Sequence, residues 1–267
     1  MAKKGDRLDI VLVNQGFFES RTRAQTAVME GTVLVNGIKV TKPGTPVAAD
    51  AVIRIIGEQL PYVSRGGLKL EKAAKVFRLS FEGKNIVDIG ASTGGFTDCA
   101  LKMGAKKVFA VDVGYGQLAW KLRRDPRVVN MERHNARYLT PGDIGEQVDL
   151  VTIDASFISL EKLVGPAFNI LKEKGELVAL IKPQFEAGKE NVGKKGVVKS
   201  PEVHVEVINS TISILQRTGF SIAGLTYSPI RGPKGNIEYL VYAVKGEKES
   251  TSEIDVRAVV EEAWRSL

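Results

Sequence analysis

Several residue types and patterns are scarce in this sequence, and each scarcity excludes a class of protein. The chain of 267 residues contains one cysteine, Cys99, which excludes an internal disulfide and a zinc site built from cysteines. No hydrophobic run approaches the roughly 18 consecutive apolar residues that a membrane-spanning helix needs. The apolar run from Ile10 to Val13, behind Lys3 and Lys4, is too short for the core of a signal peptide. We therefore expect a cytoplasmic protein without stable membrane association.

What the sequence does contain fits a globular protein with unevenly distributed basic charge. Hydrophobic residues make up 43% of the chain, and 38 Lys and Arg stand against 31 Asp and Glu. Residues 61–142 alone hold 15 basic and 7 acidic residues. Such a surface favours a polyanionic partner such as nucleic acid, although a solvated lysine-rich face would have the same composition. The length favours two domains.

Residues 1–60 are predicted to form a small α+β domain. Apolar residues recur at helical spacing over 8–12, and Ser20 is placed to cap a second helix. Asn36-Gly37 separates two β-rich runs and is a strong hairpin signal, because both turn residues need positive φ. Pro61 then marks a linker, because proline fixes φ and disfavours helix in the residue before it.

A pattern of small, apolar and basic residues extends over this first domain. Its members are Arg7-Leu8-Asp9, Leu12, Gly16, Ser20-Arg21, Ala24, Gly31, Val33 and Val35-Asn36-Gly37. This pattern resembles the S4 RNA-binding module of ribosomal proteins, pseudouridine synthases and tyrosyl-tRNA synthetases. The resemblance implies an RNA-docking surface whose basic side chains contact phosphates without reading bases. The implied RNA-binding residues are Arg7, Arg21, Arg23, Lys39, Lys42 and, just after the linker, Arg65. The alternative is a small hairpin domain with a charged exterior.

From residue 61 to residue 245 the sequence alternates helical patterns with short β-rich runs. Strands are predicted at 85–89, 107–111, 128–130, 149–153, 176–181, 221–227 and 238–244. Helices are predicted at about 67–77, 95–104, 116–123, 159–173 and 202–218. This alternation is typical of a mostly parallel sheet with helices on both faces. The acidic segment 246–267 is set apart as a tail, with a polar linker and a short helix from Val256 to Trp264.

A glycine-rich loop follows the first strand of this second domain. The small residues of Gly90-Ala91-Ser92-Thr93-Gly94-Gly95 allow a tight turn and the close approach of a ligand to a helix N-terminus. The next strand ends at Asp112, where a carboxylate can accept hydrogen bonds from ribose hydroxyls. Ser92 replaces the second glycine of the GxGxxG pattern, which weakens a nicotinamide-binding interpretation.

This loop resembles motif I of class I methyltransferases that depend on S-adenosylmethionine (SAM). The resemblance implies a Rossmann-like α/β domain with Asp88 near the amino acid moiety of SAM, Asp112 on its ribose and Asn135 on its adenine. The implied cofactor-binding residues are Asp88, Gly90, Ala91, Ser92, Gly94, Gly95, Phe96, Thr97, Asp112, Asn135 and Asp154.

Four charged residues stand where chemistry is expected. Asp154 and Lys182 each follow an apolar strand, Glu238 opens the last strand, and Lys69 lies on the first helix of the domain. Ligands bind at the carboxyl ends of the strands in an open α/β sheet, so Asp154 and Lys182 should converge there. A buried ion needs a partner, so one hypothesis is a paired ion network without a catalytic role. The order of these four residues, called the tetrad below, resembles the catalytic tetrad of FtsJ-like ribose 2′-O-methyltransferases.

With the FtsJ-like resemblance, we expect Lys182 to act as a base on a ribose hydroxyl, because positive charge from Lys69 and the sulfonium favours its neutral form. Asp154 and Glu238 would orient the Lys182 ammonium group and keep the cluster near neutral. Two other methylations fit the sequence poorly. Methylation at a pyrimidine C5 usually needs a cysteine nucleophile, and Cys99 lies on the helix after the glycine loop. Exocyclic amines are usually held by an Asp/Asn-Pro-Pro-aromatic run, whereas this sequence has Asp154-Ala155-Ser156-Phe157.

Three further features carry weaker expectations. No metal site is predicted, because His134 and His204 have no second His or Cys at ligand spacing, and both are expected to be structural or exposed. Phe157 could stack on a base, but core packing is expected. A lysine-rich loop over 188–199 could close over RNA or be a solvated loop.

Taken over residues 5–245, the S4-like module and the segments 64–70, 88–98 and 181–186 resemble the TlyA family. The resemblance implies a bacterial rRNA cytidine 2′-O-methyltransferase that acts on ribosomal subunits. Family members carry the label hemolysin A, so a membrane-active protein is an alternative, although no convincing amphipathic segment supports it. The other alternative is a non-catalytic RNA-binding factor for ribosome assembly.

Overall fold

The structure is a computed structural model, and it describes residues 5–18, 20–29, 31–56, 60–232, 234–246 and 254–267. Lys3 and Lys4 lie outside the described residues. The chain divides into two compact units, Met1–Gln59 and Leu60–Leu267. Each unit is described here by itself.

The first unit is a small α+β fold. Its elements are β1 (Asp6–Arg7), α1 (Leu8–Asn14), α2 (Arg21–Met29), β2 (Val33–Val35), β3 (Ile38–Val40), β4 (Pro46–Val47) and β5 (Ile53–Ile55). The β2–β3 hairpin turns at Asn36 and Gly37, whose φ angles of 51° and 80° confirm the predicted turn. Seven buried residues pack between the helices and the strands: Leu8, Leu12, Ala24, Ala27, Val28, Val33 and Val47.

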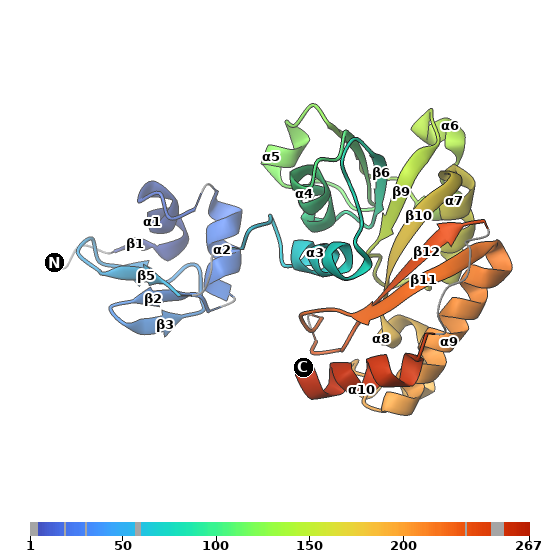
Figure 1. Ribbon diagram of the computed structural model, residues 1–267. Helices are drawn as coiled ribbons and strands as arrows, with labels where there is room; N and C mark the ends of the chain where they lie inside the picture. The colour runs from blue at the N-terminus through green and yellow to red at the C-terminus, as the bar shows by residue number, and fades with distance from the viewer. Residues whose placement is uncertain (1–4, 19, 30, 57–59, 233, 247–253) are drawn as a thin grey trace. The chain divides into compact units, whose positions relative to one another are not determined.

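The second unit is a doubly wound α/β fold (Figure 1). Its strands are β6 (Asn85–Ile89), β7 (Lys107–Val111), β8 (Val128–Met131), β9 (Val148–Ile153), β10 (Leu171–Ile181), β11 (Phe220–Tyr227) and β12 (Tyr239–Lys245). Its α-helices are α3 (Gly66–Phe77), α4 (Gly95–Lys102), α5 (Trp120–Arg123), α6 (Pro141–Ile144), α7 (Glu161–Ile170), α8 (Pro183–Glu186), α9 (Pro201–Thr218) and α10 (Val256–Ser266). Two short 3₁₀ turns, η1 (Ala136–Tyr138) and η2 (Lys189–Asn191), complete the described elements.

Within the described residues, the central sheet has seven strands in the order β11-β12-β10-β9-β6-β7-β8. β12 runs antiparallel to both of its neighbours, and the pairs from β10 to β8 are parallel. The chain moves outward from β6 through β7 to β8 on one side, and then continues with β9 and β10 on the other. This reversal places a topological switch point between β6 and β9, where open α/β sheets bind ligands.

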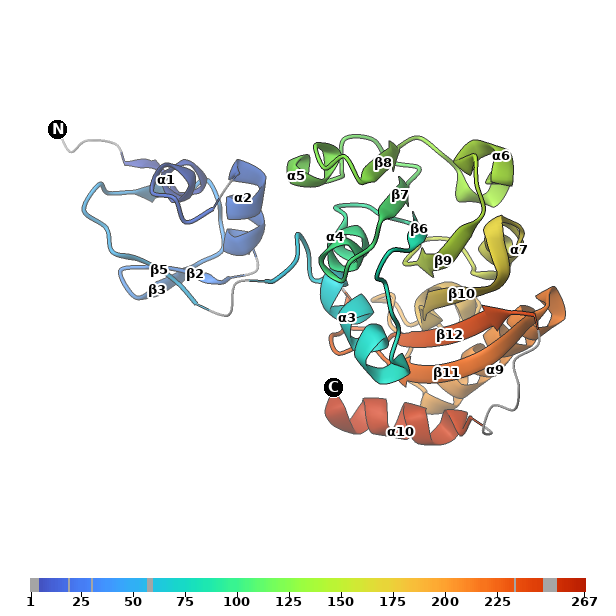
Figure 2. The same ribbon diagram turned by 45° about the horizontal axis from the view of Figure 1, so that its top comes forward.

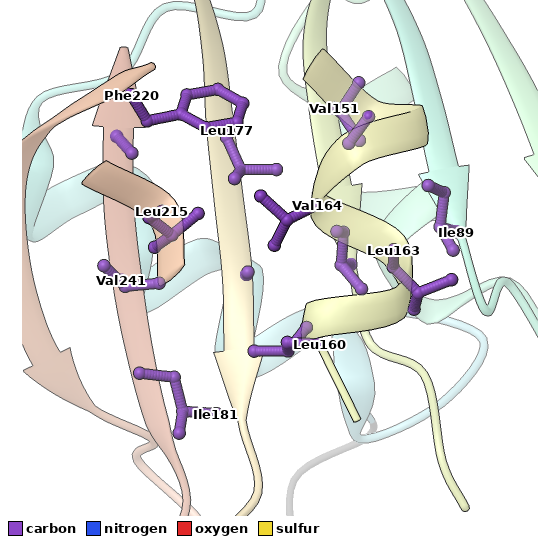
Figure 3. Close-up of a cluster of buried hydrophobic side chains, with 14 of the residues drawn as sticks. Ile89, Val151, Leu160, Leu163, Val164, Leu177, Ile181, Leu215, Phe220 and Val241 are labelled. Carbon is purple, nitrogen blue, oxygen red and sulfur yellow. The ribbon is translucent and has the colours of Figure 1, made fainter. Parts of the chain in front are cut away.

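Helices cover both faces of this sheet, as the alternating sequence pattern predicted. α3 and α4 lie side by side against one face (Figures 1 and 2), over a cluster that includes Leu70, Phe96 and Ile86. On the other face α7 and α9 pack against β9, β10 and β12 (Figure 3). The close-up labels Leu163 and Val164 of α7 and Leu215 of α9 among the buried side chains. The two apolar layers hold the strands, and therefore the loops at their ends, in fixed register.

The predicted strands and helices are mostly present, and three helices are shorter than predicted. The helix predicted at 95–104 ends at Lys102. The helix predicted at 159–173 ends at Ile170, because Leu171 adopts an extended conformation, is buried and pairs with Val148 of β9. The helix predicted at 116–123 begins only at Trp120, after a turn in which Gly116 has a φ of 72°.

The acidic segment 246–267 ends in a helix that belongs to the second unit, which differs from the separate tail predicted. Val256, Val260 and Ala263 of α10 are buried in the same cluster as the sheet, and α10 contacts α9 and β11. These three residues recur at helical spacing, so they form one apolar face while the acidic residues point outward. Residues 247–253 lie outside the described residues.

Across the described part of the chain, the helices are too short or too polar to cross a membrane.

Candidate active site

The register of the sheet brings four segments to one edge. Ile89 of β6 pairs with Ile153 of β9, so Gly90 and Asp154 follow side by side, and the Asp154 amide donates to the Ile89 carbonyl at 2.9 Å. β12 is antiparallel to β10, with Tyr239 opposite Ile181. Glu238, which precedes β12, therefore lies level with Lys182, which follows β10. The antiparallel strand explains how a residue at the start of a strand joins residues at the ends of others.

The structure brings all four tetrad residues together as one chain of alternating charge. Lys69 Nζ lies 2.7 Å from Glu238 Oε2 and 3.8 Å from Asp154 Oδ2. Lys182 Nζ lies 2.6 Å from Asp154 Oδ1. Two cations and two anions thus balance one another, which a buried cluster requires.

The four side chains differ in their exposure to solvent. Glu238 is 1% exposed, Lys69 and Lys182 are 9% and 8% exposed, and Asp154 is 19% exposed. Asp154 is therefore the most exposed member of the tetrad, and Lys182, its closest partner, is largely buried beside it.

Two polar residues that the sequence analysis did not single out contact the tetrad, and a third, Glu186, fixes the segment that follows Asp154. Gln184 Nε2 donates to Glu238 Oε1 at 3.2 Å, and Ser156 Oγ accepts from Lys182 Nζ at 2.9 Å. Glu186 accepts from Ser159 Oγ and from the Leu160 amide, both at 2.8 Å, and burial raises the pKa of Glu186. Gln184 and Glu186 lie on the single turn of α8. The segment 181–186 supported the family resemblance, but the spacing of its residues does not predict which side chains these two contact.

The glycine-rich loop lies beside the tetrad at the switch point. Gly90 has a φ of 83°, and a Cβ there would lie 2.8 Å from the Asp154 carbonyl oxygen. Gly94 has a φ of 97°, and a Cβ there would lie 2.2 Å from Leu122 Cδ1. Both positions therefore need glycine, since a side chain would displace the neighbouring backbone or helix. Ser92 and Thr93 form the exposed tip of the loop.

Asp112 is placed to bind a hydroxylated ligand over this loop. Its two carboxylate oxygens each accept one backbone hydrogen bond, from the Ser92 and Gly114 amides, both at 2.7 Å. A carboxylate has about four acceptor positions, so about two remain for a ligand. Asp112 is partly exposed, and together with the tight loop it fits the ribose of a nucleoside cofactor such as SAM.

Asp88, which the resemblance places near the amino acid moiety of SAM, is buried under the glycine-rich loop. Its side chain is 1% exposed and accepts hydrogen bonds from Thr97 Oγ1 at 2.7 Å and Thr152 Oγ1 at 3.1 Å. Burial raises the pKa of Asp88 to about 6, although the two hydroxyl hydrogen bonds oppose this change. Strand alternation places Asp88 on the same face of the sheet as Ile86, the face covered by α4. Its hydrogen bond to Thr97 therefore links β6 to the first turn of α4, next to the glycine-rich loop.

Other residues of the predicted cofactor site are also turned inward. Phe96 is 3% exposed and belongs to the core under α3 and α4, and Thr97 is fully buried on Asp88. Ala91, Gly94 and Gly95 are buried as well, so they shape the loop through the backbone. Asn135 is exposed, and its side chain accepts from the Arg137 amide at 3.1 Å as the cap of η1.

Phe157 does not pack in the core as expected. It is 89% exposed and has a φ of 63°, an unfavourable conformation for an aromatic residue. Its ring lies 5.1 Å from that of Phe185 at a tilt of 49°. The sequence does not predict the exposure of Phe157, because the segment 154–160 has no helical or strand periodicity from which burial could be inferred.

In the first unit, two of the implied RNA-binding residues also have a structural partner. Asp9 is fully buried and accepts from Arg7 at 3.0 Å, Arg21 at 2.9 Å and Gln25 at 2.7 Å. These hydrogen bonds, led by the one from Arg7, hold the pKa of Asp9 well below its usual range. Arg7 and Arg21 remain 48% and 53% exposed, so their outer faces stay available. Lys39, Lys42 and Arg65 are exposed.

His204 has the structural role that was expected. It is fully buried, with Nδ1 at 2.7 Å from the Tyr239 hydroxyl and Nε2 at 3.2 Å from the Val198 carbonyl oxygen. Burial lowers the pKa of His204, which favours a neutral ring. Its ring also lies 5.4 Å from that of Trp264 in α10. His204 therefore ties α9, β12 and α10 together.

Comparison with known proteins agrees with this geometry. The FtsJ-like methyltransferase family model matches residues 62–245, and the S4 domain model matches residues 6–53. The chain is 48% identical to a Bacillus subtilis protein named "Putative rRNA methyltransferase YqxC", over all of this chain and 97% of the relative. It is 42% identical to "16S/23S rRNA (cytidine-2'-O)-methyltransferase TlyA" of Mycobacterium tuberculosis, over 91% of this chain and 90% of the relative.

A solved structure is similar over nearly the whole chain. It is described as "Putative hemolysin from Streptococcus thermophilus", is 44% identical, and superposes with a TM-score of 0.79. The similarity covers 99% of this chain and 98% of that chain. With a family model that spans the whole sheet and its tetrad, the chain belongs to the FtsJ-like methyltransferase family and carries an N-terminal S4 domain.

Proposed function

We propose that this methyltransferase uses SAM to methylate the 2′-oxygen of a ribose, that of a cytidine, in the RNA of a ribosomal subunit. The observation that carries the proposal is the Glu238-Lys69-Asp154-Lys182 chain, whose most exposed member, Asp154, lies beside Gly90 of the glycine-rich loop. A ribose hydroxyl is a weak nucleophile, so a methyltransferase for it needs a base or strong electrostatic help. The names of the bacterial relatives support the choice of rRNA and cytidine.

The cofactor would lie over the loop at the switch point. Asp112 would accept hydrogen bonds from the ribose hydroxyls, Asn135 would lie near the adenine, and the backbone of Gly90 to Gly95 would follow the ligand closely. Asp154, whose side chain is 19% exposed, would mark the end of this site that faces the tetrad. SAM supplies the methyl group when it is bound.

Each tetrad residue has a separate task in this proposal. Lys182 Nζ first releases its ammonium proton to solvent, and the neutral amine then takes the proton of the ribose hydroxyl as the oxygen attacks. Asp154 fixes Lys182 through the 2.6 Å contact, and Lys69, held by Glu238, balances the charge of Asp154. Holding the hydroxyl in line with its reaction partner can lower the barrier by roughly 7–11 kcal/mol, so positioning contributes more than proton transfer.

The RNA would be held by both units. In the S4 domain, Arg7, Arg21, Arg23, Lys39 and Lys42 would contact phosphates, which sets register without reading sequence. In the methyltransferase unit, Arg65 would also contact a phosphate, and the exposed ring of Phe157 would offer a stacking face for a base. Ribosomal subunits are cytoplasmic, and we propose that the protein acts there.

The test measures transfer of labelled methyl from SAM to separated 30S and 50S subunits that lack the modification. Label on one subunit, found as 2′-O-methylcytidine after digestion to nucleosides, is the expected result. Lys182→Ala should abolish the label while SAM binding is kept.

Three other results would contradict the proposal. Label on a base rather than a ribose would show a different methylation chemistry. Tight RNA binding without any transfer would favour a ribosome-assembly factor. Release of contents from lipid vesicles, with no transfer to RNA, would favour the membrane-active alternative.

A further inference from the structure

Ser156 occupies a distinctive place next to the tetrad. It belongs to the segment after β9 and is exposed, yet its Oγ lies 2.9 Å from Lys182 Nζ. Lys182 Nζ has two other acceptors, Asp154 Oδ1 at 2.6 Å and the Asp154 carbonyl oxygen at 3.5 Å. Ser156 is therefore one of the two close partners of the lysine and the one nearer to solvent.

The two close partners determine where the amine can act. A neutral lysine amine has two N–H bonds, one bond to Cε and one lone pair in a tetrahedral arrangement. If Asp154 Oδ1 and Ser156 Oγ accept the two N–H bonds, the remaining position carries the lone pair. The longer contact to the Asp154 carbonyl oxygen is the one that is given up when the ammonium becomes an amine.

The segment that carries Ser156 is itself fixed at both ends. At its start the Asp154 amide donates to the Ile89 carbonyl at 2.9 Å. At its end Glu186 accepts from Ser159 Oγ and the Leu160 amide, both at 2.8 Å. The hydroxyl of Ser156 is therefore held by the fold and not by a free loop, as a positioning group requires.

We infer that Ser156 is a positioning residue that aims the lone pair of Lys182 at the ribose hydroxyl. The inference rests on the proposed function, in which Lys182 is the base. Ser156 accepts one N–H of Lys182 and forms no bond with the reacting atoms. The proton moves from the ribose oxygen to Lys182 Nζ, and Ser156 keeps its own proton throughout.

The test compares Ser156→Ala and Ser156→Thr in the full-length protein, with modification-free ribosomal subunits as substrate. Removing a hydrogen bond to a group that becomes charged should lower kcat about tenfold to a hundredfold in Ser156→Ala. The KM for RNA and the Kd for SAM should stay within about twofold, because Ser156 binds neither in the ground state. Ser156→Thr keeps the hydroxyl and should recover most of the rate.

The control is Ser213→Ala on α9, where the exposed serine hydroxyl donates to the Asn209 carbonyl oxygen of its own helix. It should match the wild type in every measurement. Circular dichroism and SAM binding check that all variants are folded. A lowered kcat that threonine restores is a result that a merely structural residue would not give.

Four outcomes would overturn the inference. One is an unchanged kcat in Ser156→Ala, and another is a Ser156→Thr rate as low as that of alanine. A raised KM for RNA with unchanged kcat would assign Ser156 to RNA binding instead. A Ser156→Ala protein that loses its fold or its SAM binding would make the residue structural.

Lys182→Ala, measured in parallel, separates this inference from the proposed function. If Lys182→Ala keeps its activity, or the wild type methylates no RNA, the proposed function fails and the inference fails with it. If Lys182→Ala is inactive while Ser156→Ala matches the wild type, only the inference fails.

Discussion

At the scale of single residues, the buried carboxyl of Asp88 makes the stability of the fold depend on pH. Its carboxyl is buried under the glycine-rich loop, and burial raises its pKa from the ordinary 3.8 to about 6. Between these two values the folded state binds more protons than the unfolded state. The free energy of unfolding therefore falls as pH rises through this window, and it is insensitive to this group above about pH 7.

Replacing Asp88 with asparagine should remove that pH dependence. From pH 5 to pH 8 the wild type should lose about 1 kcal/mol of unfolding free energy relative to Asp88→Asn, as follows from the two pKa values. Urea denaturation of both proteins at the two pH values measures the difference. A constant gap between the curves would show that Asp88 is ionised in the folded state at pH 5.

Asp9 in the S4 domain should act in the opposite sense. Its pKa is held below the ordinary value by Arg7, Gln25 and Arg21, so its contribution to stability is lost as pH falls through the acidic range. Asp9→Ala leaves three donors without their shared acceptor and should destabilise the S4 domain by about 2–3 kcal/mol. Denaturation followed by hydrogen exchange in residues 5–56 measures this. Asp50→Ala, on an exposed turn of the same domain, should change little.

At the scale of elements, the packing of α10 against the second unit was not predicted from the sequence. Its apolar face is buried on α9 and β11, and Val260 is 1% exposed. Val260→Ala should lower the free energy of unfolding by about 1–2 kcal/mol through the cavity it leaves. Glu261→Ala, one residue along on the exposed face, is the matched control. Equal stability of the two variants in urea denaturation would mean that α10 is only loosely docked.

Strand ends were predictable, whereas the orientation of single side chains was not. Asp112, Asp154 and Lys182 each follow an apolar strand, and parallel strands end at one edge, so their convergence could be predicted. The position of Glu238 depends on β12 being antiparallel with Tyr239 opposite Ile181, which no local pattern states.

The sequence also could not show which neighbours a strand-end residue meets. Asp88 lies in β6, where the residues on both faces of the strand are buried, so the sequence pattern does not show which side chains Asp88 meets. Its hydrogen bonds with Thr97 and Thr152 were therefore not expected. Phe157 is apolar and was therefore expected in the core, but the turn after β9 directs its side chain to solvent. The hydrogen bonds of Ser156, Gln184 and Glu186 depend on tertiary contacts between loops.

At the scale of the whole molecule, the basic charge predicts salt-sensitive RNA binding. Each phosphate contact that is removed should reduce the slope of log affinity against log salt by about 1. Lys39→Gln with Lys42→Gln should therefore lower the slope by about 2 and weaken binding for all RNA sequences alike. Filter binding between 50 and 200 mM salt measures it, at concentrations over which such contacts lose affinity by orders of magnitude.

Lys106→Gln is the control for that experiment. Lys106 is exposed just before β7, at the edge of the sheet opposite the tetrad, and should leave the slope unchanged. An unchanged slope in the Lys39 and Lys42 double variant would exclude these residues from phosphate contact.

The measurement that tests the account most directly is methyl transfer by Lys182→Met, compared with its stability and its SAM affinity. Methionine keeps an unbranched, flexible side chain that is one atom shorter, and it removes the amine. A catalytic tetrad predicts a loss of at least about a thousandfold in kcat of the folded protein, with SAM binding near that of the wild type, although the loss of the partner of Asp154 lowers the urea midpoint. An ion network that only stabilises the fold predicts a lowered urea midpoint and an unchanged kcat of the folded protein. A variant with a lowered midpoint that keeps the wild-type kcat in its folded fraction would contradict the account.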